Sequence, residues 1–221
     1  MVRRTKEDAL ATRQSLLDSA ELLFQAQGVS RTSLNDIAKK TGTTRGAIYW
    51  HFKDKADLFN AMMERVTLPL EQAFQDLSKD LPSDPLDRVR QVMRQALHQT
   101  ANDPRTRRVF EVCTQKVEYV DELQAVSTRH LTIRNEFLRQ VELGLNLAAA
   151  RRSLTLPISF TNAAQGLHAM VDGLIQNWLL DAKAFDLPET GEQAIDVYLK
   201  GLGFRVDPDD LLAESAKTQT V

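Results

Sequence analysis

The segment from Thr32 to Lys55, TSLNDIAKKTGTTRGAIYWHFKDK, most constrains what this chain can fold into. It holds two short helical patterns that are separated by a tight turn containing Gly42. Two short helices joined in this way and braced by a preceding helix form a helix-turn-helix unit. A helix about 10 Å across fits the major groove of DNA, so the second helix must be short and protrude. The segment therefore predicts a head that reads DNA.

Charge is distributed unevenly along the chain. Residues 1–55 contain ten Lys/Arg and six Asp/Glu, a net charge of +4, whereas the whole chain carries −2 and the remainder −6. A basic segment followed by an acidic one suggests that the first segment meets phosphate. Charge alone leaves open that this is ordinary scatter.

The pattern of apolar residues predicts an all-α fold of about nine helices, since no alternating strand pattern stands out. A first helix is expected from about Lys6 to Gln27, and Gly28 ends it. Ser33 with Asp36 caps the second helix, Thr43 or Thr44 the third, and Asp54 a long fourth. Further helices are expected near 86–100, 105–118, 121–150, 160–180 and 192–202. We divide the chain into a head (1–55), a helical body (56–206) and a loose, polar tail (207–221).

The composition predicts a cytoplasmic protein. Cys113 is the only cysteine, so no disulfide forms within the chain, which fits a reducing compartment. The basic start of the sequence is not followed by an apolar run, which argues against a signal peptide. No stretch approaches the roughly 20 apolar residues that cross a bilayer, so no membrane partner is expected.

Catalytic signatures are missing from the sequence. It has no glycine-rich phosphate loop and no pair of histidines at metal-binding spacing, and its four histidines are scattered. We expect no catalytic residue, no metal and no cofactor. A helical enzyme is kept as the alternative from a different class.

The run from Thr32 to Lys55, continuing through Asp57–Phe59, resembles the DNA-binding domain of the tetracycline-repressor (TetR) family. The matching residues are Ser33-Leu34, Asp36–Ala38, Gly42, Thr44–Phe52 and Lys53–Lys55. Within that family, RRTKEDALATR and TRGAIYWHFKDK are most similar to the AcrR/TtgR group. The resemblance is strong over residues 2–60 and weaker over the body, where DPLDRVRQVM, DPRTRR and VDGLIQNWLL still look similar.

The resemblance implies a helix-turn-helix domain followed by a helical domain for ligand binding and dimerisation. It further implies a homodimeric repressor that binds a palindromic operator on double-stranded DNA. A small hydrophobic or amphipathic, drug-like effector would release it, and the controlled genes would be a multidrug efflux pump operon linked to antibiotic resistance. Control of a catabolic or stress-response operon is the alternative.

Residue chemistry and the resemblance together predict the contacts with DNA. The guanidinium of Arg45 can bond a guanine edge in two places, and the Thr44 hydroxyl at a helix start can meet a phosphate. Gly46 permits close approach, and at least one of Tyr49 and Trp50 must face outward. The resemblance implies contacts by Arg45, Tyr49, His51 and Lys55, although His51 could instead cap or pack. The full predicted set is Arg3, Arg4, Lys6, Thr32, Ser33, Thr44, Arg45, Gly46, Tyr49, Trp50, His51 and Lys55.

The helix expected over 160–180 is apolar nearly all round, which is typical of a helix buried on both sides. One side would pack in the body and the other on a second copy, as the four-helix dimer interface implied by the resemblance requires. A central core helix of a monomer is the alternative. The predicted interface residues are Phe160, Ala163, Ala164, Leu167, Leu174, Trp178, Leu179 and Val197.

A ligand pocket is expected among the body helices. Asp172 is the most informative candidate, because a carboxylate in an apolar segment is costly to bury without a partner. It could cap a helix, pair with an arginine or bind a polar ligand group. Phe110 and Thr114 stand where relatives have Asn and His, which suggests a more apolar cavity. Each apolar candidate could instead be plain core, and the predicted set is Val66, Leu70, Val92, Met93, Ala96, Phe110, Thr114, Phe137, Val141, His168, Val171, Asp172 and Gln176.

Overall fold

The computed structural model describes residues 6–75, 84–118 and 124–206, without the side chains of 69–75 and 125. These residues form nine α-helices and no strand, which confirms the all-α prediction. The helices are α1 (Lys6–Gln27), α2 (Leu34–Thr41), α3 (Arg45–His51), α4 (Lys55–Gln75), α5 (Pro85–Asn102), α6 (Pro104–Gln115), α7 (Gln124–Arg151), α8 (Phe160–Leu180) and α9 (Leu187–Gly201).

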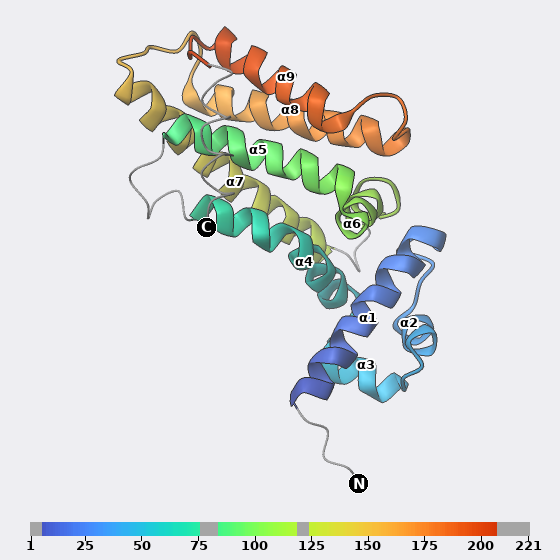
Figure 1. The fold of residues 1–221 in the computed structure, drawn as a ribbon. Helices are drawn as coiled ribbons and strands as arrows, with labels where there is room; N and C mark the ends of the chain where they lie inside the picture. The colour runs from blue at the N-terminus through green and yellow to red at the C-terminus, as the bar shows by residue number, and fades with distance from the viewer. Residues whose placement is uncertain (1–5, 76–83, 119–123, 207–221) are drawn as a thin grey trace, which may run out of the picture.

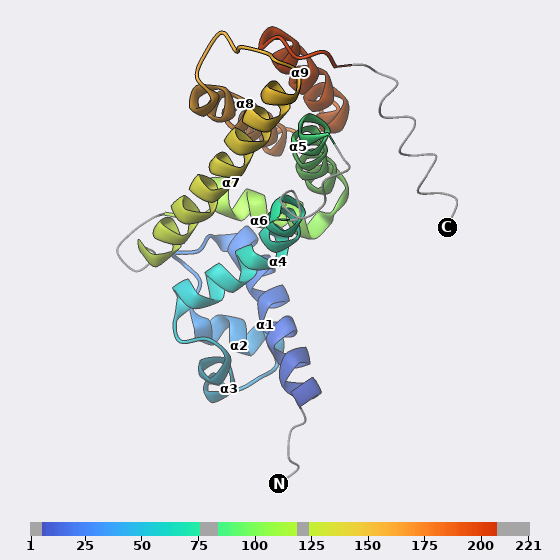
Figure 2. The same cartoon turned by 90° about the vertical axis from the view of Figure 1, so that its left-hand side faces the viewer.

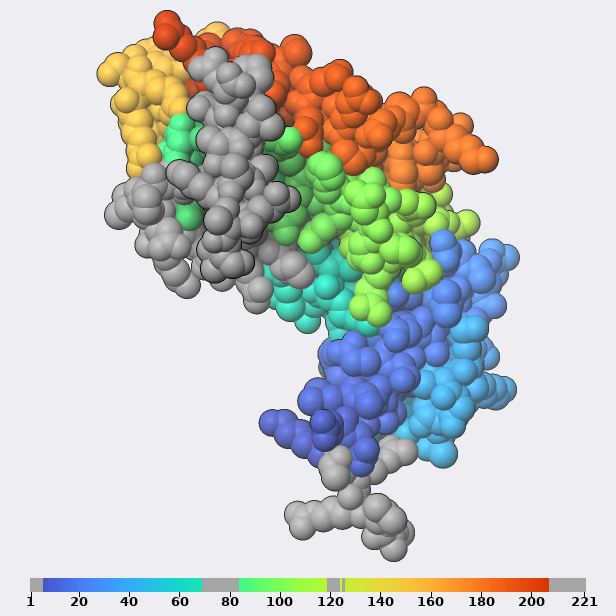
Figure 3. Space-filling view, in the orientation of Figure 1, coloured from blue at the N-terminus to red at the C-terminus, as the bar shows by residue number. Residues whose placement is uncertain are grey.

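The helices form a small head, α1–α3, and a larger body, α5–α9, with α4 running from one into the other (Figure 1). Figure 2 shows α3 at the end of the molecule opposite to α8 and α9. In the space-filling view the head and the body are two lobes that meet where α1 lies against α6 (Figure 3). Among the described residues, the body meets the head through α4, through this contact and through the segment after α6, whose Lys116 carbonyl accepts the Val29 N–H at 3.0 Å.

The head is built around side chains that have no exposed surface. Phe24 of α1, Ile37 of α2 and Ile48 of α3 meet Phe59 of α4 in one apolar cluster. The cluster continues along α4 to Val66 and includes Val109 and Val112 of α6. The head core thus extends beyond residue 55, and the division of the chain at that residue stays a prediction.

Local capping signals position the two short helices. The Ser33 hydroxyl accepts the backbone N–H of Asp36, whose carboxylate accepts the N–H of Ser33 in return, so a capping box starts α2. Gly42 ends that helix with a φ of 73°, a conformation that favours glycine. Thr44, rather than Thr43, caps α3 by accepting the N–H of Ala47. These caps hold α3 at a fixed angle to α2.

The body differs from the sequence prediction at its last helix. The helix α9 begins at Leu187, earlier than the expected start near 192. Asp186 accepts the N–H of Glu189 and Pro188 occupies the first turn, which are the usual signals of a helix start. On the neighbouring helix α5, the buried Arg90 pairs with Asp196 of α9 at 2.8 Å. The residues 207–221, expected to be a loose tail, lie outside the described residues.

None of the described helices is both long and apolar enough to cross a membrane.

Candidate DNA interface and ligand cavity

The short helix α3 turns one side chain inward and several outward. Ile48 is fully buried in the head core, whereas Tyr49 is 48% exposed and Trp50 is 73% exposed. Arg45 and Gly46 are exposed on the same helix. Both aromatics therefore face outward, and we call Arg45, Gly46, Tyr49 and Trp50 the reading face.

Contacts among neighbouring side chains orient this face. The guanidinium carbon of Arg45 lies 5.6 Å from the centre of the Tyr49 ring, within cation–π range. The Trp50 ring meets the half-buried His51 ring edge-on at 4.6 Å. These contacts limit the rotamers of the side chains that the sequence assigns to DNA.

A cleft of about 470 Å³ lies beside the reading face. Ser33 and Asn35 at the start of α2, Arg45 and Tyr49 of α3, and Lys55 of α4 contribute to its walls. The Thr44 hydroxyl accepts in the cap and donates to no other group in the described part of the chain, so its hydrogen remains available to a phosphate oxygen. The predicted residues Ser33, Arg45, Tyr49 and Lys55 are thus brought together around one concave surface.

Two of the predicted phosphate partners are not presented as expected. Thr32 is buried, and its hydroxyl donates to the Gly28 carbonyl at 2.8 Å and accepts from Gln27, so its side chain is unavailable to DNA. Ser33 is exposed, but its hydroxyl bonds Asp36 within the capping box. Both side chains serve the fold, because a short helix needs its end groups satisfied.

The basic side chains of the head also differ in their exposure. Lys55 is only 8% exposed, and its Nζ donates to the Val29 carbonyl at 3.2 Å. It lies in the wall of the cleft rather than on open surface, and its contact with DNA stays a prediction. Lys6 is exposed at the start of α1. Arg3 and Arg4 lie outside the described residues.

A second hollow of about 560 Å³ lies in the body, with walls from α4, α5, α6, α7 and α8, and we call it the cavity. Eight of the thirteen predicted ligand residues line it: Met93, Ala96, Phe110, Thr114, Phe137, His168, Val171 and Asp172. The helices expected to surround the pocket therefore do surround this cavity, and its binding of a ligand stays a prediction. The volume is in the range of cavities that hold drug-sized molecules.

Four of the remaining predicted ligand residues, Val66, Val92, Val141 and Gln176, are not among the described lining residues of the cavity. Val66, Val92 and Val141 are buried in the apolar cores, on faces of α4, α5 and α7 that pack against other helices. Gln176 is exposed and donates to the Asp172 carboxylate. The side chain of Leu70 lies outside the described residues. Asp172 itself is exposed, so the expected cost of burying its carboxylate does not arise.

Sequence reasoning missed much of the wall that α7 provides. The cavity is also lined by Met63, Thr67, Cys113, His130, Leu131, Ile133, Arg134, Glu136, Gln140, Gln165, Ala169, Gly173 and Ile175. The spacing of His130, Arg134 and Phe137 places them on one helical face, which was the available signal. Because His130 and Arg134 are polar, that face of α7 resembled solvent-exposed surface in the sequence.

Burial changes the chemistry of two lining groups. Burial lowers the pKa of His168, partly opposed by the Asp172 carboxylate, while Arg134 and His130 lower it further. Its ring meets Phe137 nearly edge-on at 5.4 Å. Burial raises the pKa of the Cys113 thiol, whose sulfur lies 2.7 Å from that of Met63. Near pH 7 the cavity thus contains a neutral imidazole and a protonated thiol.

The predicted dimer residues fall into two groups. Ala163, Ala164, Leu167 and Trp178 are buried within the single chain, so they are not surface residues and the prediction is wrong for them. Their stripe on α8 packs in the body core together with residues of α5, α7 and α9. Phe160, Leu174 and Leu179 are half-buried, and Val197 on α9 is 69% exposed. Leu180, which we did not predict, is 74% exposed.

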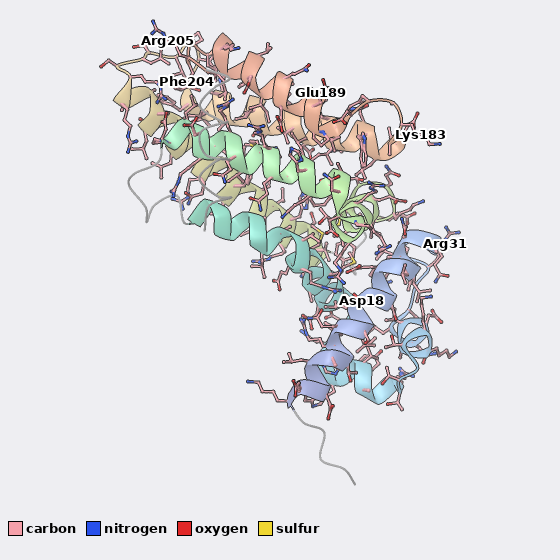
Figure 4. All side chains as sticks on the ribbon, viewed as in Figure 1. Asp18, Arg31, Lys183, Glu189, Phe204 and Arg205 are labelled. Atoms are coloured by element: carbon pink, nitrogen blue, oxygen red, sulfur yellow. The ribbon has the colours of Figure 1, made fainter. Side chains whose placement is uncertain are left out.

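Charged side chains connect head and body at what we call the joint: Asp18, Glu21, Arg65, Arg105 and Arg108. Arg65 of α4 bonds Asp18 at 2.7 Å and Glu21 at 2.9 Å. Arg105 of α6 approaches both of these α1 carboxylates, and Arg108 of α6 approaches Glu21. Figure 4 shows Asp18 on α1, close to α4. Burial raises the pKa of Glu21, against the opposing charges of the arginines. Both α4 and α6 also line the cavity, so the joint connects the cavity wall to the head.

Comparison with known proteins identifies both halves of the chain. Residues 16–62 match the model for bacterial regulatory proteins of the tetR family, and residues 84–204 match the C-terminal region of MAATS-type transcriptional repressors. The chain is 35% identical over 200 residues to the HTH-type transcriptional regulator AcrR of Shigella flexneri, covering 90% of this chain and 93% of that one.

Solved structures agree with this assignment. The fold is similar to that of NalD, the secondary repressor of the MexAB-OprM multidrug efflux pump in Pseudomonas aeruginosa, with a TM-score of 0.80 and 35% identity over 89% of this chain and 98% of that chain. It is also similar to SmeT in a complex with triclosan, with a TM-score of 0.76 and 31% identity over 86% and 90% of the two chains. SmeT is the repressor of the Stenotrophomonas maltophilia pump SmeDEF. The resemblance drawn from Thr32–Lys55 is confirmed, and the chain belongs to the TetR family of transcriptional regulators.

Proposed function

We propose that this protein is a ligand-responsive repressor that binds a palindromic operator as a homodimer and controls a multidrug efflux pump operon. The reading face is the observation that carries the proposal. A short, capped helix with exposed Arg45, Tyr49 and Trp50 has the shape and the chemistry that enter a major groove. The efflux assignment comes from the relatives, since NalD and SmeT are both named as efflux pump repressors.

The cavity supports a response to a small hydrophobic or amphipathic effector. Its wall is mostly apolar and its volume of about 560 Å³ suits a drug-sized molecule. The similar protein SmeT has been solved with triclosan. An effector that prefers one arrangement of α4 and α6 would shift the head through the joint and release the operator. We assign the protein no enzymatic activity and a cytoplasmic location.

Pairing of two chains would place two heads on the two halves of a palindrome. We propose that the exposed sides of α8 and α9 make the interface, with Val197 and Leu180 among its apolar residues. The buried stripe of α8 holds these sides in place from within the body.

The proposal is tested with a DNA fragment from upstream of the protein's own gene. We expect binding that weakens steeply with added salt, because lysine and arginine displace counterions from the phosphates. Tyr49→Ala should weaken this binding without changing the dimer measured by light scattering. Leu143→Ala, which trims an exposed leucine of the body, is the matched control. If no fragment shifts, the repressor assignment fails; if Tyr49→Ala breaks the dimer instead, the placement of the reading face fails.

Control of a catabolic or stress-response operon is the remaining alternative. Transcript levels of the neighbouring genes after deletion of this gene separate the two assignments. Derepression of a pump operon supports the efflux assignment, and derepression of metabolic genes overturns it.

A further inference from the structure

Arg13 of α1 carries a guanidinium that is oriented but not paired. Its central carbon lies 5.1 Å from the centre of the Phe52 ring, within cation–π range. Among the described residues, no ion pair or hydrogen bond of this side chain is found. Phe52, which ends α3, is only 1% exposed, whereas Arg13 is half-buried. Stacking on a ring fixes the plane of a guanidinium and leaves the N–H donors at its edge unused.

A row of rings connects Arg13 to the reading face. The Phe52 ring lies 6.3 Å from the His51 ring, which in turn meets the Trp50 ring at 4.6 Å. Figures 1 and 2 both show the start of α1 next to α3, at the end of the molecule opposite to α8 and α9. The free donors of Arg13 thus lie beside the helix that is expected to enter the groove.

The face of α1 that carries Arg13 is open. Lys6, which the sequence predicts to contact DNA, precedes Arg13 by seven residues, so the two side chains lie about two helical turns apart on one face. Leu10 lies between them on the same face and is 52% exposed. Two cations therefore follow one another along this face, and the described part of the head does not cover it.

The width of the major groove decides what groups beside α3 can touch. The groove is about 12 Å wide and is bordered by phosphates, so a helix about 10 Å across fills it. Groups beside the helix then meet the backbone rather than the bases. Arg45 and Tyr49 share one face of α3, and this face borders the cleft that contains Lys55. Arg13 is not in the walls of that cleft and approaches α3 through Phe52 instead.

We propose that Arg13 binds a phosphate of the operator backbone, and that the Phe52 ring orients its guanidinium for this contact. The fork of an arginine matches a phosphate in two places, which a lysine ammonium does not. A backbone contact fixes the orientation of the head on DNA and carries no sequence information. The proposal rests on the proposed function, because it adds a contact to the same DNA-binding head.

Salt titrations of DNA binding by the full-length protein test the proposal. Arg13→Met keeps a long apolar side chain on Phe52 and removes the charge. Each phosphate contact contributes about 0.9 to the slope of log affinity against log salt, so its loss from both heads of a dimer should lower the slope by about 1.8. Affinity near 0.1 M salt should fall about tenfold, equally for the fragment from upstream of the gene and for an unrelated fragment. Arg13→Lys keeps the charge and should restore the slope.

Arg205→Met is the matched control. This exposed arginine lies at the end of the body far from the start of α1 (Figure 4). Its replacement removes the same charge and should leave the salt slope unchanged. Denaturant unfolding of each variant is measured in parallel, and Arg13→Met should be as stable as Arg13→Lys.

The salt slope separates a phosphate contact from a role in holding α3. The proposal is overturned if Arg13→Met leaves the slope unchanged, if it weakens binding of the upstream fragment alone, or if Arg205→Met lowers the slope as much. A wild-type protein that binds the two fragments equally, with a slope that Arg13→Met lowers, fails the proposed function alone. A wild-type protein that binds neither fragment overturns both proposals.

Discussion

The reading face and the cavity are put in place in different ways. The reading face lies on α3, a helix of seven residues whose position depends on Thr44, the Ser33 capping box and the buried Ile48. The cavity takes its wall from five helices, and α7 alone contributes residues from His130 to Gln140. A site that a few local contacts build can be lost by a single substitution. A site that many distant residues share loses only part of its wall.

Removing the one inward side chain of α3 is expected to have the largest effect. Ile48→Ala should lower the free energy of unfolding of the head by about 3 kcal/mol, the usual cost of a cavity in a packed core. Because Ile48 is the buried residue that anchors α3 in the head core, operator binding should be lost, while calorimetry should still detect a probe such as 4-phenylphenol in the cavity.

Leu143→Ala is the control for Ile48→Ala, since the leucine is exposed and its loss should change stability by less than about 0.5 kcal/mol. If Ile48→Ala abolishes probe binding together with operator binding, head and body unfold as one unit. That result would contradict the distinction between a locally built reading face and a separately built cavity.

Whether a site is built by neighbouring or by distant residues also decides how much of it the sequence could predict. The caps and the turn at Gly42 are signals read from three or four neighbouring residues, so the limits of α1, α2 and α3 were predicted closely. The pocket helices were also found, but Val92 and Val141 were placed on the wrong faces. Which face of an amphipathic helix meets a cavity depends on how far neighbouring helices stand apart, and no local pattern encodes that distance.

Four of the eight predicted dimer residues were placed on the surface wrongly for a related reason. An apolar helix can be buried by its own chain or by a second copy, and composition alone does not distinguish the two. The stripe from Ala163 to Trp178 is buried by the body itself. Thr32 and Lys55 also show that a polar residue predicted to contact DNA can be held inside the head by a backbone carbonyl.

In the body, we expect the next largest effect where two helices approach closely. A methyl group at Gly191 of α9 would overlap the Leu97 side chain of α5, which is fully buried and cannot move aside. Gly191→Ala should therefore cost about 1–2 kcal/mol of stability in a denaturant titration, after the gain in helix propensity is counted.

Gly173→Ala on α8 is the matched control, because nothing lies within 4 Å of the added methyl group. It should be neutral or stabilising by up to about 1 kcal/mol. Equal losses at the two glycines would contradict the close packing of α5 and α9. Operator binding should survive both changes, because α8 and α9 lie at the end of the molecule opposite to α3 (Figure 2).

A smaller loss is expected at the start of α2. Ser33→Ala removes the hydroxyl that accepts from Asp36 N at 3.2 Å and should cost about 1 kcal/mol. Because α2 positions α3, operator affinity should fall as well, which a salt-matched binding titration measures. Ser15→Ala on the exposed side of α1 should change neither quantity. A loss of stability without any loss of affinity would show that α3 holds its position without the cap.

The smallest effect is expected at the corresponding cap in the body. Asp103 starts α6 by accepting from Thr106 Oγ1 at 2.6 Å and from the N–H groups of Thr106 and Arg105. The Thr106 hydroxyl is the main cause that lowers the pKa of this carboxyl below its ordinary value of 3.8, and partial burial opposes the shift.

The lowered pKa of Asp103 means that its ionised carboxylate stabilises the folded state above that ordinary value, and that this stabilisation is lost as the pH falls through the folded pKa. Asp103→Asn keeps one accepting oxygen of the cap but removes the charge, so it should cost about 0.5 kcal/mol at neutral pH. The difference from the wild type should shrink as unfolding is measured at pH values progressively below the ordinary pKa of 3.8. A difference that stays constant with pH would mean that the cap acts through its shape alone. Operator affinity should not follow this change, because α6 meets the head through Arg105 and Arg108 rather than through its cap.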